Sequence, residues 1–533
     1  MSTNITPLHY TLFFDPNFDD FTFTVETRLC CTVDSPATTI HLHSLELEYL
    51  EQPTIHTEST SFNCAYTTND KSELVTLSLP EEIEPQEITI HLKCKAILND
   101  NMQGFYRSSY MYNDEKHWIA STQFEAVDAR RAFPALMILL KKAKFSVGCS
   151  APKGFTALSN QPILEVQHKE DKDIYYFDEL QLTPTYLVAI AIGEFEYIET
   201  KLRDDRPVRC YCRLGQKNKL DFALDVAKRS LEWFEDYFGI KYQGKKMDLL
   251  AIPSFNYGAM ENTGLETYRE TCLFCDPISP SIQSQQRVAM VICHEHSHQW
   301  FGNYASLSSF KYLYVNEAFA EYLGFLCAAN LFPEWNYTDT MAAETILPAM
   351  KLDALSSSHP IEVELNHPRE IDEIFDHITY LKGCSLVRMI AAYMGEDGFR
   401  KSLSNFLSTY AFSNANSEQL WSCFSTDDNN LVDLMKTWVT QKGFPHVRVS
   451  KLTSRVCLRQ EAFKGKEKTL WPIPLKLVIR NKEGAQLFEK AIILDDDLAL
   501  IDFPDLESDH VLIVNPDKSS FAGLNMLLNF DQI

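Results

Sequence analysis

The sequence predicts a multidomain protein of the α+β class. Its 533 residues, 45% of them hydrophobic, can bury several cores, and a chain of this length is typical of about three domains. The pattern of apolar and polar residues changes twice along the chain, from short alternating segments to longer helical periods and back again. We therefore predict an N-terminal antiparallel β-sheet domain over residues 1–195, a mainly helical domain over residues 196–445 and a small C-terminal β-sandwich over residues 446–533.

The N-terminal region has the alternation expected of half-buried strands. Apolar and polar residues alternate in short segments, and Pro, Asn and Asp separate these segments. Clear examples are residues 21–30, 40–47 and 88–92. Together they predict an antiparallel sheet.

The central region changes to helical spacing, and the last region returns to strands. Apolar residues recur at helical intervals in residues 219–238, 285–301, 316–330 and 381–394. After Lys442-Gly443-Phe444-Pro445 the strand pattern returns in residues 447–449, 474–479 and 491–494, with turn-forming residues between them. This return of short strands predicts the terminal sandwich.

Composition and charge exclude several classes of partner. The formal net charge of -24, from 73 acidic and 49 basic residues, disfavours nucleic acid, because Lys and Arg supply most of the affinity for phosphates. The sequence shows no basic and apolar leader at its start and no apolar run of about 18 residues. We expect no membrane partner and a cytoplasmic location.

The fourteen cysteines do not form a recognisable disulfide framework. They are scattered through a large chain, and Cys30 and Cys31 are adjacent. Such scatter is unlike the compact spacing of small disulfide-stabilised domains. We interpret these residues as mostly buried thiols in a reducing compartment.

The central region contains the motif H-E-x-x-H as His294, Glu295 and His298. Histidines at positions i and i+4 lie on one face of a helix about one turn apart, so two imidazoles can share one zinc ion. An isolated match also arises by chance, because His and Glu pair on ordinary helix surfaces. A third ligand at a suitable spacing is needed to favour a metal site.

Glu317, on the next predicted helix, is the candidate for that third ligand. A catalytic zinc site has three protein ligands and a position for water, and two His with one Glu is a common set. Zinc lowers the pKa of its bound water toward neutrality, and Glu295 is placed to accept that proton and pass it to a leaving amine. The pattern predicts one Zn²⁺ per chain and metal-assisted peptide hydrolysis.

Three neighbours of these candidates have plainer interpretations. Cys293 lies in an apolar stretch and is interpreted as packing. His296 points to another face of the helix, so it is expected on the surface or behind a ligand, not as a ligand itself. Glu321, one turn beyond Glu317, either orients a ligating histidine or is an exposed helix carboxylate.

A glycine-bearing segment, Tyr257-Gly258-Ala259-Met260-Glu261-Asn262-Thr263-Gly264, precedes the zinc motif. Its glycines allow a ligand to approach the main chain closely, and Glu261 offers an anionic group. On physical grounds alone, a surface turn is the favoured interpretation of this segment.

The G-A-M-E-N segment, taken with the zinc motif and Glu317, resembles the aminopeptidase N-type family of gluzincin metallopeptidases. The resemblance implies a saddle-like N-terminal β domain and a thermolysin-like catalytic domain. It also implies that Gly258, Ala259, Met260 and Asn262 line the substrate cleft, while Glu261 binds the free α-amino group of the substrate. The expected partners are therefore peptides with a free N-terminus.

The likeness extends into the N-terminal region through Gly104-Phe105-Tyr106-Arg107-Ser108, Gln123-Phe124-Glu125 and Asp128-Ala129-Arg130-Arg131-Ala132-Phe133-Pro134. It implies that Glu125 is a second amine-binding acid, and two carboxylates around one ammonium would position the scissile bond. Gln123 and Met260 are expected to form the first side-chain pocket.

A further family segment matches Ile378-Thr379-Tyr380-Leu381-Lys382-Gly383. Its tyrosine donates a hydrogen bond to the tetrahedral oxyanion in the family, a contact that can be worth several kcal/mol. By resemblance this role falls to Tyr380. Without the resemblance, a single tyrosine is interpreted as half-buried packing.

The chain also departs from the family pattern. Ala318 follows Glu317 where glycine is usual, although this change removes no ligand. The sequence ends at Ile533, shortly after the predicted sandwich, whereas many family members carry a long C-terminal helical domain. We therefore expect a short form without that domain, an open active site and weak selection by peptide length.

Rival functions remain to be distinguished by experiment. A catalytically silent peptide-binding protein on the same scaffold is the main alternative, and the intact motif residues argue against it. An epoxide hydrolase of the leukotriene type is a second alternative, but nothing in the sequence indicates a lipid pocket. An endopeptidase is disfavoured because Glu125 and Glu261 would then face the uncharged interior of a peptide. The sequence leaves the oligomeric state, the side-chain preference and the physiological substrate open.

Overall fold

The computed structural model describes residues 4–137, 139–365, 367–426, 429–451, 455–464, 469–503 and 510–527. Ile533, where the expected short form ends, lies outside the described residues. Contacts divide the chain into two compact units. The first contains residues 1–236, 241–306 and 412–414, and the second contains residues 237–240, 307–411 and 415–533.

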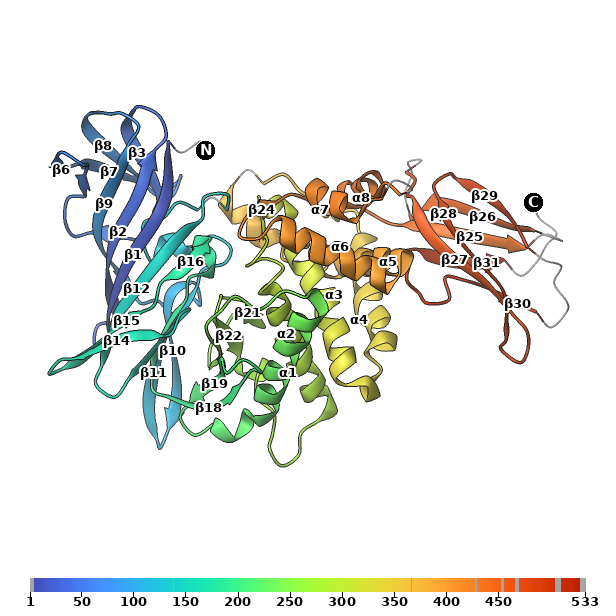
Figure 1. The fold of residues 1–533 in the computed structure, drawn as a ribbon, viewed down its shortest axis with the longest axis horizontal. Coiled ribbons are helices and arrows are strands. Elements are labelled where there is room, and N and C mark those ends of the chain that lie inside the picture. Colours follow the sequence, from blue (N-terminus) through green and yellow to red (C-terminus); the bar gives the residue numbers. More distant parts are fainter. Residues whose placement is uncertain are drawn as a thin grey trace. The chain divides into compact units, whose positions relative to one another are not determined.

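The first unit begins with three sheets, drawn in blue and cyan in Figure 1. The largest has ten strands: β1 Ile5–Asn17, β2 Thr22–Val33, β4 Glu48–Tyr49, β5 Thr54–His56, β6 Ser61–Asn63, β9 Glu87–Ile97, β12 Ala143–Pro152, β14 Ile163–His168, β15 Lys172–Phe177 and β16 Leu180–Thr183. A second sheet has four: β10 Gly104–Tyr112, β11 Glu115–Gln123, β13 Thr156–Ser159 and β17 Ile190–Gly193. The third has three: β3 Ala37–His43, β7 Ala65–Asn69 and β8 Leu74–Ile83.

Alternation along the strands explains this part of the fold. Tyr10, Leu12 and Phe14 of β1 are buried in turn and face a shared apolar core, where the rings of Tyr10 and Phe145 stack with centroids 5.0 Å apart. The prediction of β strands is confirmed, with β3 ending at His43 instead of residue 47. One pairing differs from the antiparallel prediction, because β1 pairs with β12 in parallel.

The first unit continues with a five-stranded sheet that the helical interpretation of this region missed. Its strands are β18 Phe195–Lys201, β19 Pro207–Arg213, β20 Met247–Ile252, β21 Ala259–Met260 and β22 Leu265–Arg269. All six residues of β20 are buried, so this strand lacks the polar alternation that reveals a half-exposed strand. Helices α1 Asp221–Phe238 and α2 Ile282–His298 lie beside the sheet (Figure 1).

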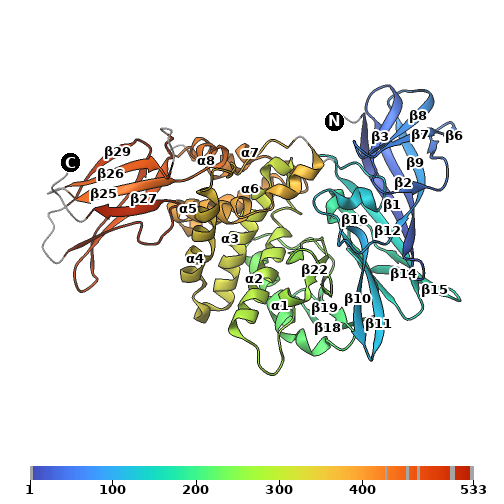
Figure 2. The same cartoon turned by 180° about the vertical axis from the view of Figure 1, so that it is seen from behind.

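The second unit is helical before it returns to strands. Its helices are α3 Tyr314–Leu331, α4 Tyr337–Asp353, α5 Gly383–Met394, α6 Glu396–Thr409, α7 Ser417–Phe424 and α8 Leu431–Thr440. Helices α3 and α4 lie side by side in the views of Figures 1 and 2. A π-helical turn, Ile378–Lys382, leads directly into α5. Two short strands that pair with each other, β23 Ser306–Leu307 and β24 Asn414–Ala415, each contain one residue of the first unit and one of the second.

Two sheets close the described part of the second unit. One contains β25 Pro445–Lys451, β26 Arg455–Ala462, β29 Leu498–Asp502 and β31 Gly523–Leu527, and the other contains β27 Ile473–Arg480, β28 Gln486–Leu494 and β30 Val511–Val514. The predicted return to strands is confirmed. The arrangement of the two sheets as a sandwich stays a prediction.

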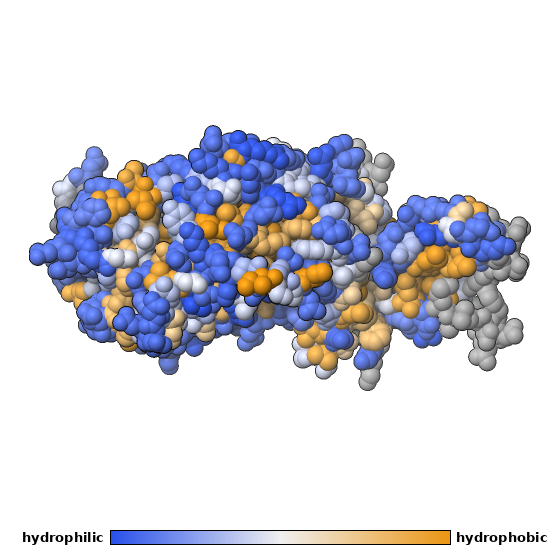
Figure 3. Space-filling view, turned by 90° about the horizontal axis from the view of Figure 1, so that it is seen from below, coloured by the Kyte–Doolittle hydropathy of each residue, from blue (hydrophilic) through white to orange (hydrophobic). Residues whose placement is uncertain are grey.

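The hydrophilic surface and the free cysteines agree with the charged composition and the scattered cysteine spacing of the sequence. Hydrophilic residues predominate on the face drawn in Figure 3, with hydrophobic residues in separate patches. All fourteen cysteines are free and most are buried, as expected from their spacing. Among the described residues, no helix is both long enough and apolar enough to cross a lipid bilayer.

Candidate active site

Helix α2 carries the H-E-x-x-H motif at its C-terminal end. Ser281 caps its first turn by accepting a hydrogen bond from the Ser284 N–H at 3.0 Å. Because Pro280 and this cap set the start, the helix runs from Ile282 to His298, about three residues earlier than predicted at both ends. Glu295 and His298 are buried, 6% and 1% exposed.

The two motif histidines face each other. The Nε2 atoms of His294 and His298 are 3.1 Å apart. Two Zn–N bonds of about 2.05 Å that meet at the tetrahedral angle would hold their nitrogens about 3.3 Å apart. The imidazole pair therefore has the separation that one zinc ion requires.

The main chain fixes the orientation of His298. Its Nδ1 lies 3.0 Å from the carbonyl oxygen of Phe301. Since a carbonyl oxygen only accepts, Nδ1 carries the proton and donates it. The lone pair of the neutral ring is therefore on Nε2. Support of this kind is what orients a histidine ligand toward a metal.

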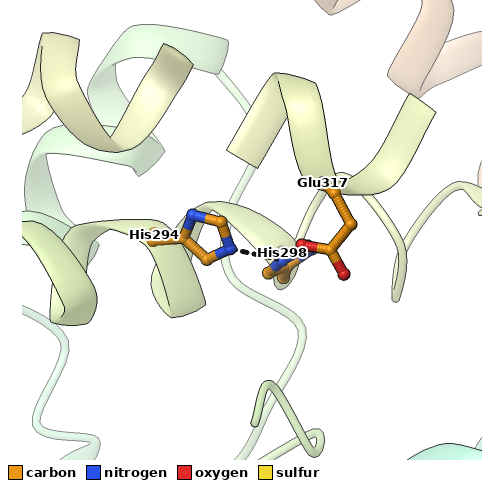
Figure 4. A group of neighbouring side chains, drawn as sticks. All are labelled: His294, His298 and Glu317. Atoms are coloured by element: carbon orange, nitrogen blue, oxygen red, sulfur yellow. Dashed lines mark hydrogen bonds between the residues drawn. The ribbon is translucent and has the colours of Figure 1, made fainter. Parts of the chain in front are cut away.

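Glu317 completes a three-residue group. It lies in the first turn of α3 and is 2% exposed. One ligand atom from each of His294, His298 and Glu317 lies within 4.8 Å of the others, and Figure 4 shows the three side chains converging. Two neutral nitrogens and one carboxylate oxygen are a suitable donor set for zinc.

Glu261, Glu295 and His298 form a second group of the same compactness, with ligand atoms within 4.8 Å of one another. This group places the glutamate of the G-A-M-E-N segment beside the motif helix. A set of two imidazoles and one carboxylate suits zinc better than a set of two carboxylates and one imidazole.

The G-A-M-E-N segment folds back as a short hairpin. Strand β21 pairs antiparallel with β22, with Met260 opposite Thr267. Gly264 turns the chain at φ +74°, and a Cβ there would lie 2.2 Å from the Asn160 carbonyl oxygen, so only glycine fits. Asn262 donates from its side chain to the Thr267 hydroxyl at 3.3 Å.

The remaining residues of this segment are distributed around the hairpin. Gly258 accepts a hydrogen bond from the Arg269 N–H at 2.9 Å, and a Cβ on Gly258 would lie 3.3 Å from an Arg287 guanidinium nitrogen. Ala259 is half-buried, whereas Met260 and Glu261 are buried. The segment is therefore an ordered hairpin and not the surface turn that physical reasoning alone favoured.

Gln123 and Met260, the two residues expected in the first side-chain pocket, are in contact. The Gln123 side-chain amide lies 3.3 Å from the Met260 sulfur. Gln123 ends strand β11, and Glu125 follows two residues later, with both side chains buried. Residues from the four-stranded sheet and the hairpin thus come together within the first unit.

Tyr380 occupies the π-helical turn of the second unit. Single π turns in helical segments occur frequently at functional sites. The turn is anchored by Lys382, whose ammonium lies 2.9 Å from the Asp353 carboxylate in a fully buried pair. Tyr380 itself is half-buried, and its ring lies 6.4 Å from that of Phe375.

His296 is the clearest difference from the sequence interpretation. The surface alternative is wrong, because His296 is fully buried. Its Nδ1 lies 2.7 Å from the Ser230 hydroxyl and its Nε2 lies 3.4 Å from the Glu266 carboxylate. Burial lowers the pKa of His296 to about 3, so the ring is neutral. Cys293 is fully buried, which confirms its interpretation as packing.

Three buried polar residues near the site were not identified from the sequence: Glu266, Gln299 and Asn303. Burial raises the pKa of the Glu266 carboxyl well above its ordinary value, and the nearby Glu295 adds to this shift. Gln299 and Asn303 follow the zinc motif directly in the chain. The two polar residues that flank Trp300, Phe301 and Gly302 were the sequence signal that could have identified them.

Two protein-family models match the chain. The Peptidase M1 N-terminal domain matches residues 6–187, and the Peptidase family M1 domain matches residues 222–438. The second match contains the zinc motif, Glu317 and Tyr380.

Several aminopeptidases are similar to the chain. Aminopeptidase M1-B of Oryza sativa subsp. japonica is 39% identical over 480 residues, which cover 88% of this chain and 54% of that protein. Aminopeptidase M1 of Arabidopsis thaliana is 40% identical over 423 residues, covering 79% of this chain and 48% of that protein. The puromycin-sensitive aminopeptidase of Caenorhabditis elegans is 35% identical over 459 residues, covering 85% of this chain and 48% of that protein.

The chain spans about half the length of the curated relatives it matches. The two domain matches follow one another along the chain, and both belong to the same peptidase family. The resemblance stated from the sequence is therefore confirmed at the level of the family. The chain belongs to peptidase family M1.

Proposed function

We propose that the protein is a zinc-dependent aminopeptidase that hydrolyses the N-terminal peptide bond of peptides. The observation that carries this proposal is the convergence of His294, His298 and Glu317 on one point (Figure 4). Glu261 and Glu295 supply acidic groups beside it. The names of the relatives, all aminopeptidases, support the same activity.

His294, His298 and Glu317 are proposed to hold one Zn²⁺ per chain. When bound, zinc supplies a Lewis acid that lowers the pKa of water toward neutrality and polarises the scissile carbonyl. The donation from His298 Nδ1 to the Phe301 carbonyl supports this assignment, because it keeps Nε2 directed at His294.

Glu295 is proposed to act as general base and then as general acid. It follows His294 on α2, and its carboxylate lies within 4.8 Å of a His298 nitrogen. From this position it accepts the proton of the attacking water and transfers it to the leaving amine. A carboxylate in this role contributes a factor of about 10² to 10⁴ in rate.

Glu261 and Glu125 are proposed to bind the α-amino group of the substrate. Charge-assisted hydrogen bonds from an ammonium to buried carboxylates are short and directional, so they fix the distance from the amino end to the scissile bond. Met260 and Gln123 are proposed to line the first side-chain pocket, a role that their mutual contact supports. Gly258, Ala259 and Asn262 are proposed to border the cleft with main-chain groups.

Tyr380 is proposed to donate its phenolic hydrogen to the oxyanion of the tetrahedral intermediate. The π turn that carries it, anchored by Lys382 and Asp353, supports a fixed orientation. We further propose three domains, over residues 1–195, 196–445 and 446–533, with a C-terminal sandwich. A cytoplasmic location fits the fourteen free thiols.

The proposal is tested by hydrolysis of a panel of aminoacyl fluorogenic amides. Wild type is compared with Glu295→Gln, with Glu418→Gln as a matched control on an exposed helix position, and with N-acetylated forms of the same substrates. We expect activity in wild type and in Glu418→Gln, and its loss on Glu295→Gln substitution or on acetylation. A wild-type protein that contains stoichiometric zinc but cleaves no substrate would establish the silent peptide-binding alternative.

A further inference from the structure

The main-chain carbonyl of Glu261 is held by two buried side-chain amides. The Nε2 of Gln299 donates to it at 3.1 Å and the Nδ2 of Asn303 donates to it at 2.9 Å. A carbonyl oxygen has two lone pairs, so these two donors use its full accepting capacity. Gln299 and Asn303 are 4% and 8% exposed, which means that water does not compete for the same oxygen.

The two amides also bind to each other. The Asn303 Nδ2 directs its second hydrogen to the Gln299 Oε1 at 3.2 Å. The Gln299 Nε2 directs its second hydrogen to the Glu266 carboxylate at 2.9 Å. All four amide hydrogens are therefore committed, and neither side chain can rotate without breaking two hydrogen bonds.

Glu266 connects this pair to the rest of the first unit. Its second carboxyl oxygen accepts a hydrogen bond from the Tyr268 hydroxyl and lies 3.4 Å from the His296 Nε2. His296 in turn reaches Ser230 on α1 at 2.7 Å. The network thus ties the hairpin of β21 and β22 to α1 and to the residues around the zinc motif.

We infer that Gln299 and Asn303 are positioning residues that set the place of the Glu261 carboxylate for recognition of the substrate α-amino group. This inference rests on the proposed aminopeptidase function. Strand β21 has only two residues, so its own ladder provides little hold on the main chain that follows it. The two amides supply that hold, and they stand one and five residues beyond His298.

The consequence is a fixed distance between the amine site and the reacting centre. His298 and the two amides belong to one continuous segment, so a shift of the motif helix carries the Glu261 main chain with it. A misplacement of about 1 Å between substrate and catalytic groups can reduce rate by about 10²-fold. We call the two amides of Gln299 and Asn303 on the Glu261 carbonyl the clamp. The clamp is expected to affect turnover through the position of Glu261 and not through metal binding.

The test is a double-mutant cycle between Gln299→Met and Glu261→Ala. Methionine keeps the length of the glutamine side chain and removes both donors. In the wild-type background we expect kcat/KM for the best aminoacyl amide of the panel to fall about tenfold. In the Glu261→Ala background we expect the same substitution to cost less than about twofold, with zinc content unchanged in every variant.

Binding provides a second readout that does not require turnover. Calorimetric titration of leucinamide into Glu295→Gln protein should give a dissociation constant about tenfold weaker when Gln299→Met is added. Gln460→Met is the matched control, because Gln460 is a buried amide that donates to the Trp471, Leu494 and Asp496 carbonyls in the C-terminal sheets. It should lower Tm without changing KM.

The results of the cycle and of the titration either support or overturn the positioning role of Gln299 and Asn303. An equal loss from Gln299→Met in both backgrounds, or a loss of zinc, would overturn the inference. If Gln299→Met does not fold, Asn303→Leu removes the other pair of donors and is subjected to the same cycle. If wild type cleaves nothing, the proposed function fails separately, and the leucinamide titration alone then supports or overturns the clamp.

Discussion

His298 donates from Nδ1 to the Phe301 carbonyl at 3.0 Å while its Nε2 lies 3.1 Å from the Nε2 of His294. The acceptor is only three residues away in the chain, in the turn that follows α2. A local contact therefore selects the His298 tautomer that has its lone pair on Nε2, independently of long-range packing. This preparation lowers the cost of binding a metal, because the ligand tautomer is already selected.

Metal removal should abolish activity reversibly. Treatment with a chelator, followed by desalting, is expected to leave no measurable hydrolysis, and one equivalent of Zn²⁺ should restore it. Wild-type protein should contain one zinc per chain by atomic absorption, whereas His298→Ala should contain far less. Full activity in metal-free protein would contradict the assignment of His294, His298 and Glu317.

Tyr380→Phe should reduce kcat with little change in KM. Loss of one oxyanion donor costs about 10² to 10³ in kcat, because the contact forms only in the transition state. Steady-state kinetics on one aminoacyl amide measure the effect. Tyr176→Phe is the control, since Tyr176 is an exposed tyrosine of β15, 38% exposed. Equal kinetics for Tyr380→Phe and wild type would remove Tyr380 from the mechanism.

Glu261→Ala should weaken the selection for a free amino end. A hydrogen bond to a charged group contributes about 1.5 to 3 kcal/mol, so kcat/KM for a free-amine substrate should fall about 10- to 100-fold. The residual activity on the N-acetylated substrate should stay unchanged. The measured quantity is the ratio of the two kcat/KM values, and an unaltered ratio would contradict amine recognition by Glu261.

Lys382→Met should destabilise the second unit. The substitution leaves the buried Asp353 carboxylate without its cation, and such losses cost about 3 to 5 kcal/mol. Asp353 would retain the hydrogen bonds from the Ser358 hydroxyl and the Gly443 N–H. We expect a lower Tm by calorimetry and partial recovery in the double variant Lys382→Met, Asp353→Asn. The exposed substitution Lys401→Met should leave Tm within about 1 °C, because surface changes alter stability little.

The pair of His359 and Asp376 should make stability depend on pH. The hydrogen bond with Asp376 raises the pKa of His359 above its ordinary value, and burial opposes this shift only in part. The stabilisation is therefore fully present below about pH 6.5, the unfolded pKa of histidine. It is lost as pH rises through the higher pKa of the folded state.

His359→Gln should remove that dependence. The difference in Tm between wild type and His359→Gln is expected to be larger at pH 5.5 than at pH 9. The pair is partly exposed, so its contribution should stay below about 1 kcal/mol. Calorimetry at the two pH values measures it, and a Tm difference independent of pH would show that His359 is not charged in the fold.

Local spacing allowed much of the site to be predicted. His294, Glu295 and His298 lie within one helical turn and a residue, so the geometry of a helix alone places both imidazoles on one face. Strands β2 and β9 of the N-terminal sheet were also predicted from the sequence, because their alternate residues face opposite sides. The role proposed for Glu261 came from the resemblance alone, since a glycine-bearing segment by itself favours a surface turn.

Fully buried elements escaped the sequence analysis. Strand β20 is buried at every position, and an apolar run without alternation does not separate a strand from a helix. His296 and Glu266 escaped for a related reason. A polar residue is expected at the surface unless its partners are known, and His296 of α2 finds its partners in Ser230 of α1 and Glu266 of β22.

The sequence by itself determined the periodic elements, the helical pair of imidazoles and the family of the chain. Each of these depends on residues close together in the chain, where helix and strand geometry fixes which side chains share a face. Only the tertiary structure decided that Glu261 lies beside His298, and that Gln299 and Asn303 close on the Glu261 carbonyl. Those contacts join segments about forty residues apart, and packing, not local spacing, selects them.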